Sequence, residues 1–151
     1  MALIVQKFGG TSVGSAERII NVAKKVGEFR DKGNDIIVVV SAMSGETNRL
    51  TELAREISSK PKTREIDVLL STGEQVTIAL LAMALESKGY EAVSFTGGQV
   101  KILTDDFYTK ARIKEIETHS IRNEVSSGKI VIVAGFQGVD SKGNITTLGR
   151  G

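Results

Sequence analysis

Four short segments combine glycine and hydroxyl side chains with one or two charged residues, a composition typical of loops that bind anions. They are KFGGTS at 7–12, SAMSGETN at 41–48, STGEQ at 71–75 and TTLGRG at 146–151. Glycines let the backbone approach a ligand closely and turn its N–H groups towards it. Lys7 and Arg150 add positive charge, which favours phosphate or carboxylate groups. Together, the four segments predict loops around an anionic ligand.

For each segment taken alone, a purely structural role is the alternative. A Gly-Gly pair after a strand is often only a tight turn, and Ser or Thr in such loops often caps a helix. The named phosphate motifs are also absent. Gly9 and Gly14 have the glycine spacing of a P-loop, but Ser15 stands where that motif needs lysine, and no G-x-G-x-x-G is present. The sequence therefore contains neither a Walker P-loop nor a Rossmann fingerprint.

Other residues with catalytic or metal-binding chemistry are few. His119 is the only histidine and lies in the polar stretch EIETHSIRNE, so a solvated position is expected. Asp105 and Asp106 are adjacent, and a turn or helix start is favoured over a metal pair. The absence of cysteine excludes disulfides, thiolate catalysis and Cys-type zinc sites.

Composition narrows the range of partners. The 151 residues include 20 basic and 18 acidic side chains, a balance that gives no electrostatic case for binding nucleic acid or an anionic membrane. The apolar runs are shorter than the ~20 residues of a membrane helix. The N-terminus, MALIVQKFGG, lacks the features of a signal peptide, so a cytoplasmic protein is expected.

The elements that would position these loops follow from hydrophobic patterning. Apolar, β-branched runs at 3–6, 36–40 and 130–134 predict buried strands, and 93–95 and 100–103 are weaker candidates. None of the three main runs alternates cleanly between apolar and polar residues, which suits strands covered on both faces of a parallel sheet.

Helical periodicity lies between these runs. It is seen in residues 19–29 after the expected N-cap Ser15, in residues 50–57, and in residues 76–85 before Lys88 and Gly89. One or two short helices are expected in 113–125, and DSKGN at 140–144 predicts a hairpin turn. The alternation predicts a three-layer α/β/α sandwich with a mainly parallel central sheet and the three main runs in its interior. In such sheets ligands bind past the carboxyl ends of the strands.

In this order, the four segments resemble those of the aspartate kinases, within the amino-acid-kinase family. The segments KFGGTS, VVVSAMSGETN, STGEQVTIALLAMAL, VAGFQGV and TTLGRG each look like the corresponding aspartate-kinase segment. The resemblance covers the whole chain, and KFGGTS and TTLGRG are the motifs specific to aspartate kinases. It implies the amino-acid-kinase fold.

The resemblance also implies an activity: ATP-dependent phosphorylation of the L-aspartate β-carboxylate to 4-phospho-L-aspartate, the first step towards lysine, threonine, methionine and diaminopimelate. It implies an ATP-phosphate site at Lys7, Phe8, Gly9, Gly10 and Ser41, with Lys7 as the catalytic residue. It implies an aspartate site at Ser41, Thr47, Glu74, Phe136, Arg150 and Gly151, where Glu74 receives the substrate ammonium and Arg150 the α-carboxylate. Mg²⁺ would be bound to the nucleotide, with no metal site on the protein. Lys7, Ser41, Thr47 and Glu74 should then converge on one cleft.

The end of the chain departs from the aspartate-kinase pattern. In that family TTLGRG continues as Gly-Gly-Ser-Asp, and the nucleotide side of the catalytic domain and the ACT regulatory domains follow. The resemblance thus places residues 1–151 in the N-terminal, substrate-side part of a catalytic domain. We therefore expect a fold that is incomplete at the C-terminus, a chain that is inactive alone, and a homo-oligomer.

Two other functions remain open at this point. An acyl-phosphate-forming kinase acting on glutamate or N-acetylglutamate would share the glycine loop, although SAMSGETN and TTLGRG favour aspartate. A catalytically silent binding or assembly module is the other possibility, because the chain is expected to end before a nucleotide site is complete.

Overall fold

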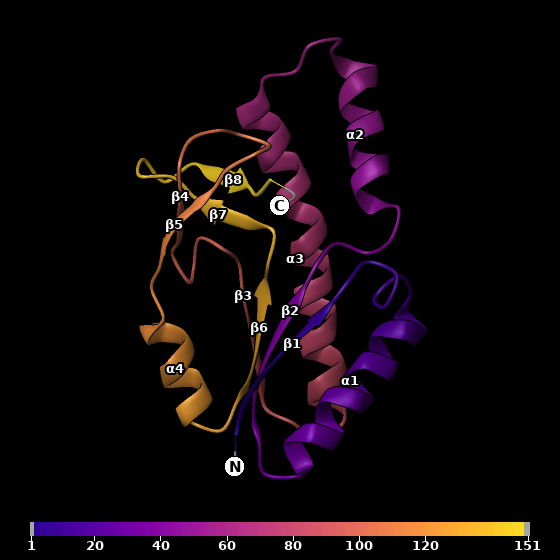
Figure 1. Ribbon diagram of the computed structural model, residues 1–151. Helices are drawn as coiled ribbons and strands as arrows, with labels where there is room; N and C mark the ends of the chain where they lie inside the picture. The colour runs from indigo at the N-terminus through magenta and orange to yellow at the C-terminus, as the bar shows by residue number, and fades with distance from the viewer. Residues whose placement is uncertain (1, 150–151) are drawn as a thin grey trace.

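The computed structural model describes residues 2–149, which form two four-stranded sheets and four helices (Figure 1). In sheet A the strand order is β1 (Leu3–Phe8), β2 (Asp35–Val40), β6 (Ile130–Ala134) and β3 (Ala92–Phe95). Every neighbouring pair of strands in this sheet is parallel. The predicted α/β fold with a mainly parallel central sheet is confirmed.

The position of β1 differs from the expectation, because this strand lies at an edge of sheet A and not in its interior. All five residues of the central strand β6 are buried. On β1, by contrast, Leu3 and Val5 are 49% and 61% exposed. Apolar composition predicted the strand correctly, but it carries no information on which strand becomes the edge.

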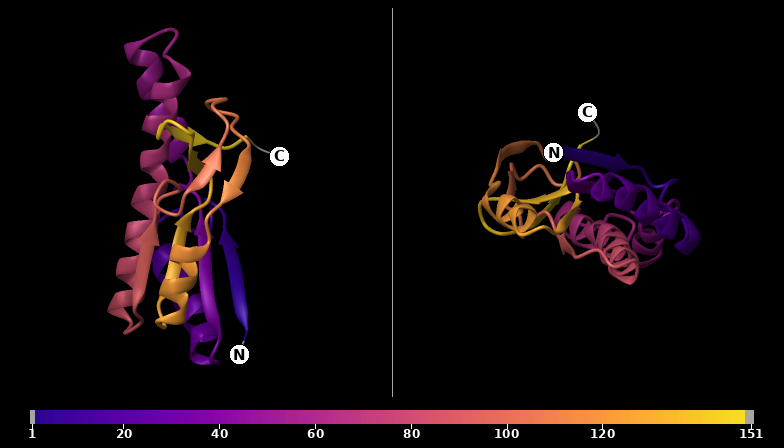
Figure 2. Two further views of the ribbon diagram at one scale, coloured as in Figure 1. Left: turned by 90° about the vertical axis from the view of Figure 1, so that its left-hand side faces the viewer. Right: turned by 90° about the horizontal axis from the view of Figure 1, so that it is seen from below.

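Helices cover both faces of sheet A, which gives the three layers (Figures 1 and 2). Helices α1 (Ala16–Asp31) and α3 (Thr63–Ser87) pack on one face, and α4 (His119–Ser126) packs on the other. Helix α1 begins at the predicted N-cap Ser15, whose hydroxyl accepts a hydrogen bond from the Arg18 N–H. Helix α2 (Glu46–Ile57) packs against α3.

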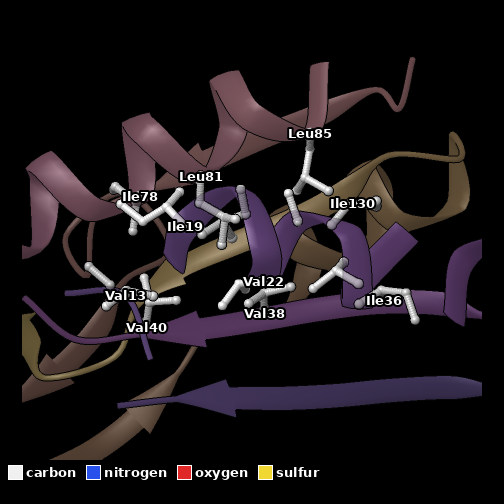
Figure 3. Close-up of a cluster of buried hydrophobic side chains, with 14 residues drawn as sticks. Val13, Ile19, Val22, Ile36, Val38, Val40, Ile78, Leu81, Leu85 and Ile130 are labelled. Carbon is white, nitrogen blue, oxygen red and sulfur yellow. The ribbon is translucent and has the colours of Figure 1, made fainter. Parts of the chain in front are cut away.

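The main apolar core lies between sheet A and the helices α1 and α3 (Figure 3). Val38 of β2 and Leu81 and Leu85 of α3 are fully buried in it. Burial of one such aliphatic side chain is worth about 1.5–3 kcal/mol, so this cluster is a main source of folding free energy. The opposite face of β6 supplies Val131 and Val133 to a smaller cluster beneath α4.

Helix α3 has 25 residues and includes STGEQ at 71–75, which the sequence pattern assigns to a loop. That prediction is wrong. The hydroxyls of Ser71 and Thr72 each donate to a carbonyl of the preceding turn at 2.7 Å, so they are satisfied within the helix. Gly73 permits a close helix contact, because a Cβ there would lie 3.0 Å from the Ala42 Cβ. The small residues mark tight packing and not a break in the helix.

By length and composition alone, α3 is also apolar enough to cross a membrane, with a mean hydropathy of 1.6 over its most apolar stretch. One such helix is weak evidence, since core helices of globular proteins share these properties. Here α3 packs Leu81 and Leu85 against sheet A and carries two buried carboxylates, Asp67 and Glu74. The apolar length of α3 is accounted for by its place in the core.

Sheet B lies beside the N-terminal half of α3 (Figure 1). Its strand order is β5 (Ile113–Ile116), β4 (Ile102–Thr104), β7 (Gln137–Val139) and β8 (Ile145–Thr147). Strands β7 and β8 are antiparallel and flank residues 140–144, so the predicted hairpin is confirmed. Of the rest of sheet B, the sequence indicated only β4, through the weaker strand candidate at 100–103, and β5 was not expected.

Two predictions near sheet B are wrong in part. Residues 113–125 are predicted to be helical, but Ile113–Ile116 forms β5, which pairs antiparallel with β4. Ile113 and Ile116 have the three-residue spacing of a helix, yet both are exposed, so the spacing does not reflect a buried helix face. The run 100–103 becomes a strand only at Ile102, because Lys101 lies in a turn with φ of 51°.

Candidate active site

A cavity of about 510 Å³ opens at the carboxyl edge of sheet A. The loops that follow β1, β2 and β6 reach it, and the helices α2 and α3 complete its walls. Its lining residues are Lys7, Gly9, Gly10, Ser41, Ala42, Met43, Ser44, Gly45, Thr47, Asn48, Leu70, Glu74, Phe136 and Thr147. Segments far apart in the sequence thus meet at the edge where ligands bind in sheets of this kind.

The loop after β1 supplies one wall of the cavity. The Ser44 N–H donates to the Gly10 carbonyl at 3.1 Å, which ties this loop to the loop after β2. A Cβ at Gly10 would lie 3.0 Å from the Ala42 carbonyl oxygen, so the close approach of the two loops favours glycine there. A Cβ at Gly9 would meet nothing within 4 Å, so the backbone at Gly9 borders open space. That space suits a ligand group held by backbone N–H groups.

The N-terminus of α2 supplies a second wall. Its N-cap, Gly45, has a φ of 84° and no side chain to occupy the first N–H groups of the helix. Thr47 and Asn48, in that first turn, line the cavity. First-turn N–H groups lack partners within their helix, and the helix dipole adds positive potential. This wall, like the glycine loop, is suited to a phosphate or carboxylate group.

Glu74 is the acidic residue of the cavity, and the middle of α3 positions it. Its side chain is nearly buried, at 4% exposed. The carboxylate accepts hydrogen bonds from the Phe136 N–H at 2.9 Å and from Gln137 Nε2 at 3.0 Å. Burial raises the pKa of Glu74 to about 7, because the charged form loses water there, and the two hydrogen bonds offset this only in part. A cationic ligand group would favour the ionised carboxylate.

Phe136, in the loop after β6, contacts both charged residues of the cavity. The Lys7 ammonium lies 4.9 Å from the centroid of the Phe136 ring, a cation–π contact, while the Phe136 backbone N–H donates to Glu74. Within residues 2–149, Lys7 forms no ion pair with a carboxylate. The positive charge of Lys7 is therefore available to an anion in the cavity.

Asp67 is a buried residue near the site that the sequence analysis missed. It is fully buried on α3, and its carboxylate accepts hydrogen bonds from the Thr109 N–H and from the N–H and hydroxyl of Thr147, at 2.7–3.0 Å. Thr109 has a φ of 73°, which is unfavourable for a β-branched residue, and these bonds hold it there. Because Thr147 lines the cavity, Asp67 fixes part of its wall.

The second missed residue is Gln137, which donates to Glu74 and is 2% exposed. For the buried polar residues of α3, in contrast, the sequence contains a spacing pattern that could have identified them. Asp67, Ser71 and Glu74 are spaced by four and three positions, which places them on one face of a helix. A polar stripe of this kind on an otherwise apolar helix indicates a buried polar contact.

The structure brings together seven of the residues named from the sequence: Lys7, Gly9, Gly10, Ser41, Thr47, Glu74 and Phe136. Phe8 is different, because its side chain packs against the apolar core and does not line the cavity. Consecutive residues of a strand point to opposite faces, so Lys7 and Phe8 cannot both face the ligand. Arg150 and Gly151 lie outside the described residues.

The remaining candidates have local roles. Asp105 accepts hydrogen bonds from the N–H groups of Phe107 and Arg112 at 3.2 Å, which confirms its expected turn role. His119 is exposed at the start of α4, as expected. Residues 2–149 contain no group of three or more His, Cys, Asp or Glu side chains that could hold a metal ion.

Fold and cavity together define the class: an α/β protein with a cleft suited to an anion at the carboxyl edge of a parallel sheet. The sequence model of the amino acid kinase family matches residues 2–151. The chain therefore belongs to the amino acid kinase family.

Individual relatives agree with the resemblance drawn from the motifs. An aspartate kinase of Stutzerimonas stutzeri is 68% identical over 151 residues, which are 100% of this chain and 37% of that protein. The crystal structure of aspartate kinase from Synechocystis has a TM-score of 0.80 and 46% identity, over 99% of this chain and 24% of that chain. E. coli aspartokinase III in complex with aspartate and ADP has a TM-score of 0.83 at 24% identity, over 100% of this chain and 44% of that chain, a likeness of fold alone. The chain thus spans less than half the length of these relatives.

Proposed function

We propose that this chain is the N-terminal, substrate-side part of an aspartate kinase. The kinase transfers the γ-phosphoryl group of ATP to the β-carboxylate of L-aspartate and forms 4-phospho-L-aspartate, in the cytoplasm, on the route to lysine, threonine, methionine and diaminopimelate. The observation that carries this proposal is that a lysine–glycine loop and a buried carboxylate line the same cavity. The similarity to aspartate kinases supports the choice of substrate.

The phosphate end of the site lies at the loop after β1. Lys7 contacts the phosphoryl group in transfer, and the N–H groups of Gly9 and Gly10 lie beside it, with Ser41 on the neighbouring loop. These residues fit phosphate oxygens, since they offer a cation and backbone donors next to open space. Mg²⁺ carried by the nucleotide would neutralise further phosphate charge. We assign the adenosine part of ATP to the portion of the kinase beyond this chain.

The aspartate end of the site lies between α2 and α3. Glu74 receives the substrate ammonium, Thr47 and Phe136 contact the substrate, and Arg150 and Gly151 bind the α-carboxylate. A β-carboxylate has a pKa near ~3.9, so it is ionised at neutral pH and needs no general base. One of its oxygens attacks the γ-phosphorus while the bond to ADP breaks. Catalysis is then mainly positioning and neutralisation of charge.

Glu74 also bears on the choice among acyl-phosphate-forming kinases. A buried carboxylate is costly unless a cation pairs with it, and a free α-ammonium provides that cation. N-acetylglutamate has no ammonium, so it would leave Glu74 unpaired. Glutamate keeps the ammonium but places its side-chain carboxylate one methylene further away. The site therefore favours a free amino acid as the acceptor.

The direct test is hydroxamate trapping of the acyl phosphate with ATP and Mg²⁺, using the complete kinase. Aspartate should give product, while glutamate and N-acetylglutamate should give little. The same assay on the 151-residue chain should give no turnover, because phosphoryl transfer needs both reactants held in line. A complete protein that binds aspartate and ATP in calorimetry but forms no hydroxamate would point to a catalytically silent module instead.

We also propose that the kinase is a homo-oligomer. Strand β1 leaves one edge of sheet A unpaired within residues 2–149, and Leu3 and Val5 on it are exposed. Exposed strand edges and apolar surface favour association unless another part of the protein covers them. Sedimentation of the complete kinase would show its oligomeric state.

A further inference from the structure

Gln137 is a buried amide at the junction of three elements, at the start of β7. Its Nε2 donates to Glu74 Oε1 at 3.0 Å and to the Ser71 carbonyl at 3.1 Å, both on α3. Its Oε1 accepts from the Gly97 N–H at 3.2 Å, in the loop after β3. One side chain thus joins β7, α3 and the carboxyl edge of sheet A, directly behind the cavity.

The partners of Gln137 fix which way its amide faces. Glu74 and the Ser71 carbonyl offer acceptors on one side, and the Gly97 N–H is a donor on the other, so a flipped amide would lose all three bonds. The loop after β3 is packed tightly against this residue, since a Cβ at Gly97 would lie 2.2 Å from the Gln137 carbonyl oxygen. The amide is therefore held from both sides.

We propose that Gln137 is a positioning residue of the aspartate site, which fixes the Glu74 carboxylate at the cavity and ties it to the loop after β3. This inference rests on the proposed function, because it takes Glu74 as the partner of the substrate ammonium. A carboxylate held by two directed donors presents its remaining lone pairs in a fixed direction. If Gln137 had only a structural role, its replacement would leave the pKa of Glu74 and its binding of the ammonium unchanged.

The charge on Glu74 follows from the same contacts. The Phe136 N–H and Gln137 Nε2 both favour the ionised form, against burial, which raises the pKa of Glu74. Among residues 2–149, the other charged groups around this part of the cavity are Lys7 on β1, the ion pair Glu46–Arg49 on α2, and Asp67 on α3, which bonds to the cavity residue Thr147. Within the described part of the chain, no hydrogen bond or ion pair joins any of them to Glu74, so none of them replaces the lost Gln137 donor.

The test is the pH dependence of the aspartate KM in the complete kinase carrying Gln137→Met. Methionine fills similar space without a donor, so the pKa that governs KM should rise by about one unit, the usual size for one lost hydrogen bond. The aspartate KM should then increase about fivefold at pH 7 and return close to wild type at pH 9, where Glu74 is ionised in both proteins. The kcat at saturating aspartate should change little.

Two further variants keep the result decisive. Gln137→Glu is isosteric and retains an acceptor for the Gly97 N–H. Because it places a second carboxyl beside Glu74, the pKa that governs the aspartate KM should rise even more than in Gln137→Met. This variant provides the test if the methionine variant does not fold. Thr146→Val is the matched control. It removes a buried hydroxyl pair with Thr104 in the same sheet without touching Glu74, so it should lower stability and leave the KM profile in place.

Glu74→Gln separates this inference from the proposed function. It should raise the aspartate KM at pH 8 and abolish its dependence on pH in this range. If Glu74→Gln leaves both unchanged, the ammonium role of Glu74 is wrong, and the proposed site fails with it. If Glu74→Gln behaves as expected but both Gln137 variants keep the wild-type profile, or raise KM equally at every pH, the positioning role of Gln137 is refuted alone.

Discussion

The two halves of α3 hold the neighbouring sheets by different physical means. The C-terminal half packs Leu81 and Leu85 into the apolar core against sheet A. The N-terminal half presents Asp67, Glu74 and the Ser71 carbonyl to sheet B and to the loops around it, through hydrogen bonds of 2.7–3.1 Å. One continuous helix therefore has an apolar interface and a polar interface.

The difference shows how stability and site geometry are divided in this molecule. Apolar burial is non-directional, so it stabilises the fold without fixing individual atoms closely. Hydrogen bonds are directional, so they hold Glu74 and Thr147 in defined positions at the cavity, at a small net gain in stability. We therefore expect substitutions in the polar half to alter activity and those in the apolar half to alter folding.

The largest effect is expected at the cavity, for Lys7→Ala in the complete kinase. Loss of a cation that acts on developing phosphoryl charge should lower kcat by about 100–1,000-fold and raise the aspartate KM much less. The melting temperature should stay near wild type, because Lys7 is exposed. Steady-state kinetics of Lys7→Ala are compared with those of Lys25→Ala, which removes an exposed lysine of α1 as a control. A rise in KM with unchanged kcat would mean that Lys7 only binds substrate.

The next effect belongs to the apolar half. Leu81→Ala should lower the free energy of unfolding by about 2–5 kcal/mol, because Leu81 is fully buried and a cavity would remain. Its kcat/KM, corrected for the folded fraction, should stay close to wild type. Denaturant unfolding together with kinetics measures both. A large loss of kcat/KM in folded Leu81→Ala enzyme would contradict the division between the two halves.

A smaller effect is expected in the pH dependence of stability without ligand. The folded-state pKa of Glu74 is raised from 4.5 to about 7, so its contribution to stability is fully present below pH 4.5 and is lost as pH rises through 7. Wild type should lose roughly 2 kcal/mol from this group between pH 5 and 8.5. Glu74→Gln should not show this loss. If the free energy of unfolding, measured with urea, changes with pH by the same amount in both proteins, a raised pKa of Glu74 is excluded.

The smallest effect is expected for Thr147→Val, which removes one hydroxyl donor from Asp67. A single such bond contributes about 1 kcal/mol, so the loss in stability should be of that size, with a modest rise in aspartate KM. Thr77→Val is the matched control in the apolar half, since among the described residues the Thr77 hydroxyl bonds only to the Gly73 carbonyl of its own helix. Equal KM values for the two variants would weaken the link between Asp67 and the cavity.

Sequence patterns predicted the parts of this molecule that local composition specifies. The apolar runs of sheet A, the N-cap Ser15 and the hairpin at 140–144 are properties of neighbouring residues. The place of β1 at an edge and the second sheet depend on contacts between distant segments. STGEQ was assigned wrongly because glycine and hydroxyl residues occur both in loops and at close helix contacts, and only the neighbour Ala42 distinguishes the two.

The candidate site divides in the same way. Lys7, Glu74 and the glycines could be named because they lie in recognisable segments, and the structure places them around one cavity. Asp67 and Gln137 were missed, since their importance comes from partners 30 or more positions away in the sequence. Phe8 was named from the same segment, yet its side chain packs against the core, because a motif does not state which strand residues face the cavity.

The division of α3 also has a consequence for local opening. Hydrogen bonds to sheet B are lost together when solvent reaches them, whereas the apolar half opens only if the core around Leu81 comes apart. Backbone amides before Glu74 should then exchange with solvent through partial opening, and those after Thr77 only through unfolding of the whole domain. A single helix would belong to two cooperative units, with the boundary at the turn that carries the carboxylate of the cavity.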